Sequence, residues 1–193
     1  MAEYDKEMKN LAMRLMRVML KSLGLDDGDV KCTNLVDQAA ELTGAVRVNS
    51  CPACPDPDRA MGMAAHSDSS LVTILYQNGT SGLQVLRAGD ESGPACWAAV
   101  PAVRGSLIVI LGDLFQVLTN GLFRSAFHRA LVNRSERRLS AAYFCGPAAT
   151  AKVGPVAKLV DPARGPCYRA VTWPEYRDIR AELFQEALES LKM

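Results

Sequence analysis

The sequence predicts a mainly β protein with flanking helices, whose β core is a sandwich, a barrel or a double-stranded β-helix (jelly roll, cupin-like). Two observations carry this prediction. Short runs of β-forming residues follow one another between residues 71 and 144, separated by turn pairs such as Asn78-Gly79 and Asn120-Gly121. Apolar residues at helical spacing occur instead at the two ends of the chain.

The first element is expected to be an amphipathic helix over residues 3–23. Its apolar residues recur at three- and four-residue steps, at Met8, Leu11, Leu15 and Met19. Gly24 supplies the stop signal. A second short helix is expected over residues 34–42. We therefore predict a helical N-terminal segment, residues 1–45, that packs on the core.

The core domain is expected over residues 46–171. Its strands are predicted from short apolar or aromatic runs bounded by turn residues. These runs cover residues 71–76, 83–86, 97–100, 107–111, 115–118, 127–132 and 139–144. Their number and even spacing favour a sandwich, a barrel or a jelly roll.

The C-terminal segment, residues 172–193, is expected to be one helix. Thr172 and Glu175 fit a capping box, in which each side chain bonds to the backbone of the other residue. One helical face then carries Tyr176, Ile179, Leu183, Ala187 and Leu191. Such a stripe is more typical of core packing than of a partner-binding surface.

Composition excludes several classes of protein. The chain has 193 residues, 49% of them hydrophobic, and 22 basic against 21 acidic side chains. This balance excludes a disordered tail, a collagen-like repeat and a coiled coil, and it favours neither nucleic acid nor a membrane as a partner. Because no apolar signal segment opens the sequence, we expect a cytoplasmic protein with reduced cysteines. We also expect a monomer.

The two histidines of the chain lie in a pattern that suits a metal ion. His66 and Asp68 precede an apolar run, and in extended chain residues i and i+2 point to the same side. His128 lies in a distant strand-like run and supplies a third ligand. Two histidines and one carboxylate on one face of an ion are the set expected of non-haem Fe(II) oxygenases.

A second pair of residues suits a carboxylate co-substrate. Arg138 and Ser140 share one face of a predicted strand ten residues beyond His128. A guanidinium fork beside a hydroxyl can hold both oxygens of a carboxylate. It therefore fits the far carboxylate of 2-oxoglutarate, whose keto-acid end chelates the metal.

These residues resemble the plant 2-oxoglutarate- and Fe(II)-dependent dioxygenases. The likeness extends over essentially the whole chain and is carried by residues 61–86, 105–123 and 128–147. Within that family the segments NSCPACPDPDRAMG, ILYQNGTSGLQV and YRAVTWPEY are most similar to gibberellin 3-oxidases. Those enzymes 3β-hydroxylate inactive gibberellin precursors.

The resemblance implies a double-stranded β-helix (jelly-roll) core, a function and a set of site residues. His66, Asp68 and His128 would bind iron, and Arg138 with Ser140 would hold 2-oxoglutarate. The reaction would use O2 to hydroxylate a gibberellin-type diterpenoid acid and would release succinate and CO2, with ascorbate as a supporting reductant. Tyr76, Phe127 and Phe144 are expected to line the substrate pocket.

Two departures from the family pattern change what we expect of this chain. Members of the family are commonly nearly twice as long, so a truncated chain with an exposed apolar patch is expected. Cys51 stands where the family has a tyrosine that donates to 2-oxoglutarate. Because a thiol is a much weaker donor, weaker co-substrate binding with intact iron ligation is expected.

Other interpretations of the same residues remain open. The chain could be a catalytically impaired paralogue that acts only by binding, or that has no function. It could equally be a gibberellin 2-oxidase or another plant small-molecule hydroxylase. A thioredoxin-type or zinc role for Cys51 and Cys54 is disfavoured by the prolines that follow and by the lack of a second ligand pair.

Overall fold

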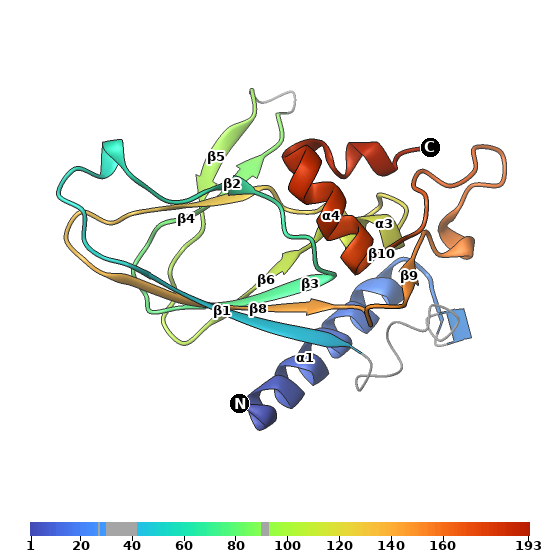
Figure 1. Ribbon diagram of the computed structural model, residues 1–193, viewed down its shortest axis with the longest axis horizontal. Helices are drawn as coiled ribbons and strands as arrows, with labels where there is room; N and C mark the ends of the chain where they lie inside the picture. Colours follow the sequence, from blue (N-terminus) through green and yellow to red (C-terminus); the bar gives the residue numbers. More distant parts are fainter. Residues whose placement is uncertain (27, 30–41, 90–92) are drawn as a thin grey trace.

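Two four-stranded antiparallel sheets face each other and form a jelly roll (Figure 1). The computed structural model describes residues 1–26, 28–29, 42–89 and 93–193. The first sheet has the order β1-β8-β3-β6, with β1 at Thr43–Cys51, β8 at Arg138–Gly146, β3 at Val72–Gln77 and β6 at Leu107–Leu111. The second has the order β2-β7-β4-β5, with β2 at Met61–His66, β7 at His128–Leu131, β4 at Leu83–Arg87 and β5 at Cys96–Ala99. The predicted fold class is confirmed.

Short elements complete the fold. Strands β9 (Lys152–Val153) and β10 (Val171–Thr172) pair in a small sheet beside the C-terminal helix. Single 3₁₀ turns, η1 and η2, lie at Pro57–Arg59 and Ala157–Leu159. The predicted helix over residues 34–42 falls almost entirely outside the described residues. The five cysteines in the described ranges, including Cys51 and Cys54, are free thiols, as expected.

Helix α1 (Ala2–Ser22) packs against the outer face of the first sheet, as Figure 1 shows. It ends where predicted, because Gly24 takes a positive φ of 79° that favours glycine. The centre of its buried face is formed by Ala12, Met16 and Leu20. The expected stripe of Met8, Leu11 and Met19 lies beside that centre and is only partly buried.

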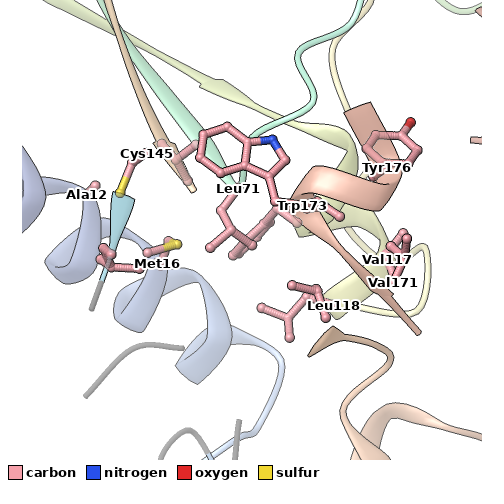
Figure 2. Packing of buried hydrophobic residues seen from close by; sticks show 14 of the residues in the cluster. Ala12, Met16, Leu71, Val117, Leu118, Cys145, Val171, Trp173 and Tyr176 are labelled. Atoms are coloured by element: carbon pink, nitrogen blue, oxygen red, sulfur yellow. The ribbon is translucent and has the colours of Figure 1, made fainter. Parts of the chain in front are cut away.

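Packing under α1 accounts for much of the larger core. Met16 lies against the cluster that also contains Leu71, Cys145 and Trp173 (Figure 2). We expect Met16→Ala to lower the free energy of unfolding by about 2–5 kcal/mol, because it removes buried methylenes and leaves a cavity. Urea denaturation measures this loss. Val18→Ala is the control, since Val18 is exposed on the same helix; an equal loss in both variants would contradict the packing.

One predicted strand is a helix. Residues 115–118 belong to α3 (Asp113–Leu118), which begins after Gly112 at the end of β6. Its buried apolar residues are Leu114, Phe115, Val117 and Leu118, and Asp113 at the first position is buried as well. These positions follow helical spacing once Leu114 is included, so the four-residue window was too short to show the period. Asn120 and Gly121, expected as a turn, end this helix with positive φ angles of 53° and 84°.

The C-terminal segment is not one helix. The predicted capping box of Thr172 and Glu175 is present and begins α4 (Trp173–Leu183). The chain then breaks at Phe184, with φ of 48°, and continues as the 3₁₀ turns η3 (Phe184–Glu186) and η4 (Glu189–Leu191). The break turns Ala187 and Leu191 into the core and leaves Leu183 exposed. The predicted stripe is therefore correct at its ends and wrong at Leu183.

An apolar row crosses the outer face of the first sheet. Val48, Ala141, Tyr76 and Leu107 are register neighbours on β1, β8, β3 and β6. Val48, Tyr76 and Leu107 are exposed, as is the adjacent Leu139. The expected exposed apolar patch is present on this face. Among the described residues no helix combines the length and the hydropathy that a membrane span requires.

Candidate metal and co-substrate site

The second sheet brings the two histidines together. Strands β2 and β7 pair so that His66 lies directly opposite His128. Asp68 follows His66 by two residues, in the segment between β2 and β3. One ligand atom from each of these three side chains lies within 4.8 Å of the others. The structure thus gathers the three residues that the sequence pattern selected, from positions 60 residues apart along the chain.

Backbone carbonyls determine which imidazole nitrogen is free. Nδ1 of His66 lies 2.7 Å from the Ala64 carbonyl oxygen, and Nδ1 of His128 lies 2.9 Å from that of Ala126. Because a carbonyl oxygen only accepts, each Nδ1 carries the proton and each Nε2 keeps its lone pair. The two Nε2 atoms lie 3.6 Å and 3.9 Å from Oδ1 of Asp68.

The protonation state of His66 also suits a ligand. Burial lowers the pKa of His66, and the neighbouring His128 acts in the same direction. The Ala64 carbonyl and the Asp68 carboxylate oppose this shift, but the net direction is downward. A lower pKa keeps the imidazole neutral near pH 7, and metal binding requires the neutral form.

The Asp68 carboxylate fits a metal ligand better than a hydrogen-bonding group. It is 5% exposed, and its Oδ2 atom has no hydrogen-bond partner within the described ranges. An unpaired buried carboxylate oxygen is costly unless a cation or a donor compensates it. Two imidazole nitrogens and one carboxylate oxygen form a donor set suited to Fe(II) with coordination positions left open.

The first sheet supplies the second half of the site. On β8, Arg138 lies opposite Cys51 of β1, and Ser140 lies between Asn49 of β1 and Gln77 of β3. Arg138 donates from Nη2 to Oε1 of Gln77 at 3.0 Å and from Nη1 to Oγ of Ser140 at 3.4 Å. The predicted pairing of Arg138 and Ser140 on one strand face is therefore present.

Arg138 is a buried cation without a carboxylate partner in the described part of the chain. Its exposed fraction is 3%, and its Nε atom has no hydrogen-bond partner among those residues. Burial lowers its pKa, with a smaller opposing effect from Cys51, yet a guanidinium stays charged in proteins. Gly82, at φ of 153°, lies close to both β7 and this side chain: a Cβ there would come 2.6 Å from the Leu131 carbonyl oxygen and 3.0 Å from the Arg138 Cδ.

Both groups open into one cavity between the two sheets. Its polar lining includes His66, Asp68, His128, Arg138 and Ser140. The other lining residues are Arg47, Asn49, Cys51, Gly62, Met63, Thr73, Leu75, Leu83, Ile110, Ala130, Ala142 and Phe144. The cluster of His66, Asp68 and His128 shares this mainly apolar cavity with a guanidinium that has no carboxylate partner among the described residues. Such a cavity can bind a dicarboxylate at one end and an apolar substrate at the other.

The expected substrate-pocket residues are divided by the structure. Phe144 lines the cavity on β8. Tyr76 does not: residues alternate between the faces of β3, so Thr73 and Leu75 face the cavity, and Tyr76 is exposed on the opposite face. Phe127 lies just before β7 outside this lining, with its ring 6.1 Å from that of Trp97. The assignments of Tyr76 and Phe127 to the pocket lining are therefore corrected.

Several residues of the site were not identified in the sequence. Gln77 holds Arg138, but in the sequence it appears only as a polar residue that ends an apolar run. Arg47 and Asn49 share the cavity face of β1, a strand that the sequence did not predict. The available signal was the alternation of Arg47, Asn49 and Cys51 with Val46, Val48 and Ser50.

The comparisons with known proteins agree with this geometry. The family model described as the 2OG-Fe(II) oxygenase superfamily matches residues 42–147. Gibberellin 3-beta-dioxygenase 1 of Arabidopsis thaliana is 48% identical over 98% of this chain and 52% of its own length. Gibberellin 3-beta-dioxygenase 1 of Pisum sativum is 47% identical over 99% of this chain and 50% of its own length. The chain thus spans about half the length of the curated relatives it matches.

A solved structure extends the similarity to the fold. The crystal structure of JOX2 in complex with 2OG, Fe and JA superposes with a TM-score of 0.84 at 30% identity. The match covers 99% of this chain and 55% of that one. The rice dioxygenase for auxin oxidation gives a TM-score of 0.69 at 27% identity, over 78% of this chain and 51% of its own.

Proposed function

We propose that this chain, which belongs to the 2OG-Fe(II) oxygenase superfamily, is an Fe(II)- and 2-oxoglutarate-dependent dioxygenase that hydroxylates a gibberellin precursor. One observation carries the proposal. The His66, Asp68 and His128 cluster opens into the same cavity as Arg138, a buried guanidinium with no carboxylate partner among the described residues.

The residues of the cavity have two roles, metal binding and co-substrate binding. His66, Asp68 and His128 would hold Fe(II), with each imidazole oriented by the carbonyl behind it. Arg138 and Ser140 would bind the far carboxylate of 2-oxoglutarate, and Gln77 keeps the guanidinium in place. When bound, the iron would supply activation of O2, coupling decarboxylation of 2-oxoglutarate to succinate and CO2 with hydroxylation of an aliphatic C–H bond.

The remaining lining supports an apolar acid as substrate. Leu75, Leu83, Ile110 and Phe144 provide hydrocarbon contacts and exclude water from the reacting centre. Arg47 adds a second cation to the lining, which suits a substrate carboxylate. A gibberellin-type diterpenoid acid has both features, and the gibberellin 3-beta-dioxygenases named above support 3β-hydroxylation.

An anaerobic titration followed by an oxygen-dependent assay tests the proposal. We expect one Fe(II) and one 2-oxoglutarate to bind per chain, and succinate to form when a gibberellin precursor and O2 are added. Mass spectrometry of the product identifies the oxidised carbon, which separates 3β-hydroxylation from 2-oxidation or another hydroxylation. Metal binding without turnover would select the catalytically impaired paralogue, and no metal binding by the folded chain would overturn the proposal.

Two further parts of the proposal are measured in the same preparation. Ascorbate should increase the number of turnovers before inactivation without changing the initial rate.

A monomer is expected by light scattering, although the exposed residues Val48, Tyr76 and Leu107 form a continuous apolar row. Association through that face would replace the monomer in the proposal and leave the site unchanged.

Cys51→Tyr is expected to strengthen 2-oxoglutarate binding by about tenfold or more, because a phenol donates to a charged carboxylate and contributes about 1.5–3 kcal/mol. Position 51 lies opposite Arg138 and lines the cavity. Isothermal titration with Mn(II) in place of Fe(II) measures the affinity. Cys51→Phe is the control, since it adds the ring without the hydroxyl; equal affinities in the two variants would show that the hydroxyl has no such role.

A further inference from the structure

The carboxylate of Asp113 accepts a hydrogen bond from Ser67, the residue between His66 and Asp68 of the candidate metal cluster. Ser67 lies between His66 and Asp68, and its Oγ donates to Oδ2 of Asp113 at 2.9 Å. Asp113 is 1% exposed and is the first residue of α3. It lies outside the set of side chains that converge on the metal position.

The same carboxylate oxygen accepts two hydrogen bonds from α4. Tyr176 donates its hydroxyl at 2.8 Å, and Arg180 donates from Nη1 at 2.7 Å. The same Nη1 lies 3.2 Å from Oγ of Ser67. Burial raises the pKa of Tyr176, so its hydroxyl remains a donor across the physiological pH range. Asp113, Ser67, Tyr176 and Arg180 therefore form one network, which we call the Asp113 clamp.

Backbone and side-chain contacts hold the adjacent residues as well. The backbone N–H of Asp113 donates to the Asp68 carbonyl oxygen at 2.7 Å. Trp173, the first residue of α4, donates from Nε1 to Oγ of Ser69 at 3.1 Å. Residues 67, 68 and 69 are thus each bound to α3 or α4, whereas the cavity face of Asp68 is left for a metal.

We infer that Asp113 is a positioning residue for the metal centre, and that the clamp sets the affinity of the site by tying the His66–Asp68 segment to the C-terminal helix α4. The inference rests on the proposed function, since it assumes that the cluster binds a divalent ion. Its physical basis is that partners outside the ligand set orient the ligands, and that their loss commonly weakens metal binding by about 10–100-fold.

Asp113→Asn and Ser67→Ala in the full chain test the clamp, with Co(II) as the probe. Asp113→Asn keeps the size of the side chain and the backbone N–H bond to Asp68. It removes the negative charge that accepts hydrogen bonds from Arg180 and Tyr176. We expect Co(II) affinity to fall by about 10–100-fold and the visible Co(II) absorption to change, because the ligand geometry relaxes. Ser67→Ala should produce a smaller loss in the same direction.

Tyr143→Phe serves as the matched control. Like Tyr176, Tyr143 is fully buried and donates to an aspartate, here Asp5 of α1 at 2.7 Å, on the face of β8 opposite the cavity. Tyr176→Phe should weaken Co(II) binding, whereas Tyr143→Phe should lower the unfolding temperature without changing Co(II) affinity or absorption. This contrast separates positioning of the ligands from general stability.

The outcomes are distinguishable. If wild type binds Co(II) at one ion per chain and folded Asp113→Asn and Ser67→Ala bind it within twofold of wild type, the positioning role is overturned. If Asp113→Asn does not fold, Ser67→Ala and Tyr176→Phe decide the inference by the same criterion. If wild type itself binds no Co(II), Mn(II) or Fe(II), the proposed function fails, and the inference fails with it.

Discussion

Asp68→Asn is expected to abolish Fe(II) binding and succinate formation while leaving the metal-free chain at least as stable as wild type. The carboxylate is buried, its Oδ2 has no partner in the described residues, and its Oδ1 lies 3.6 Å and 3.9 Å from the two imidazole Nε2 atoms. Removing a ligand should weaken the site by more than the 10–100-fold typical of outer partners. Replacing an uncompensated buried charge by a neutral amide removes a desolvation cost.

Two measurements check this result. Anaerobic Fe(II) titration gives the affinity, and urea denaturation in the presence of a chelator gives the free energy of unfolding. Asp161→Asn is the control, because Asp161 is exposed on a loop, where it pairs with Arg164 and accepts the backbone N–H of Ala163. Wild-type Fe(II) affinity in Asp68→Asn would show that the carboxylate is not a ligand. A large loss of metal-free stability would show that the carboxylate is satisfied without metal.

Arg138→Met is expected to weaken 2-oxoglutarate binding by at least about 30-fold, corresponding to about 2 kcal/mol or more, with Fe(II) affinity unchanged. The guanidinium is the buried cation that faces the cavity beside Ser140, and methionine keeps similar bulk without charge. The variant removes a buried charge but also leaves Oε1 of the buried Gln77 without its donor, which costs about 1–3 kcal/mol of metal-free stability.

The neighbouring arginine provides a close control. Arg137 is exposed one residue earlier on the chain, so Arg137→Met changes the net charge equally without touching the cavity. The 2-oxoglutarate affinity of Arg138→Lys should fall between those of wild type and Arg138→Met, since lysine keeps the charge but cannot bind a carboxylate in the bidentate geometry. Isothermal titration of 2-oxoglutarate on the Mn(II)-loaded chain measures all three. Equal affinity in wild type and Arg138→Met would mean that the co-substrate carboxylate binds elsewhere.

Strand prediction succeeded where a strand is one apolar run and failed on β1, where polar residues interrupt the run. The runs at residues 71–76, 107–111 and 139–144 match β3, β6 and β8 closely. On β1, polar residues face the cavity, whereas Val46 and Val48 are exposed on the outer face. The usual rule of apolar-in and polar-out is reversed there, as the proposed binding of a metal and a dicarboxylate between the sheets would require. The same reversal misplaced Tyr76.

Helix prediction depended on how many turns of regular apolar spacing each helix contains. Helix α1 has several turns of regular spacing and a glycine stop, so its range was predicted to within a residue at each end. Helix α3 is only six residues long, and a short apolar window does not separate a helix from a strand. The break at Phe184 has no local signal in the sequence, since it arises from the docking of Ala187 and Leu191 in the core.

The sequence by itself determined the mainly β fold class and selected the residues of the candidate site, because residue types and their spacing along strands carry that information. Only the tertiary structure decided that His66 lies opposite His128, and that Gln77 and Cys51 flank the Arg138–Ser140 face. It also brought Asp113, Tyr176 and Arg180 behind Ser67. Those contacts join residues 46 to 113 positions apart, and such pairings depend on how sheets and helices pack, which local sequence patterns do not encode.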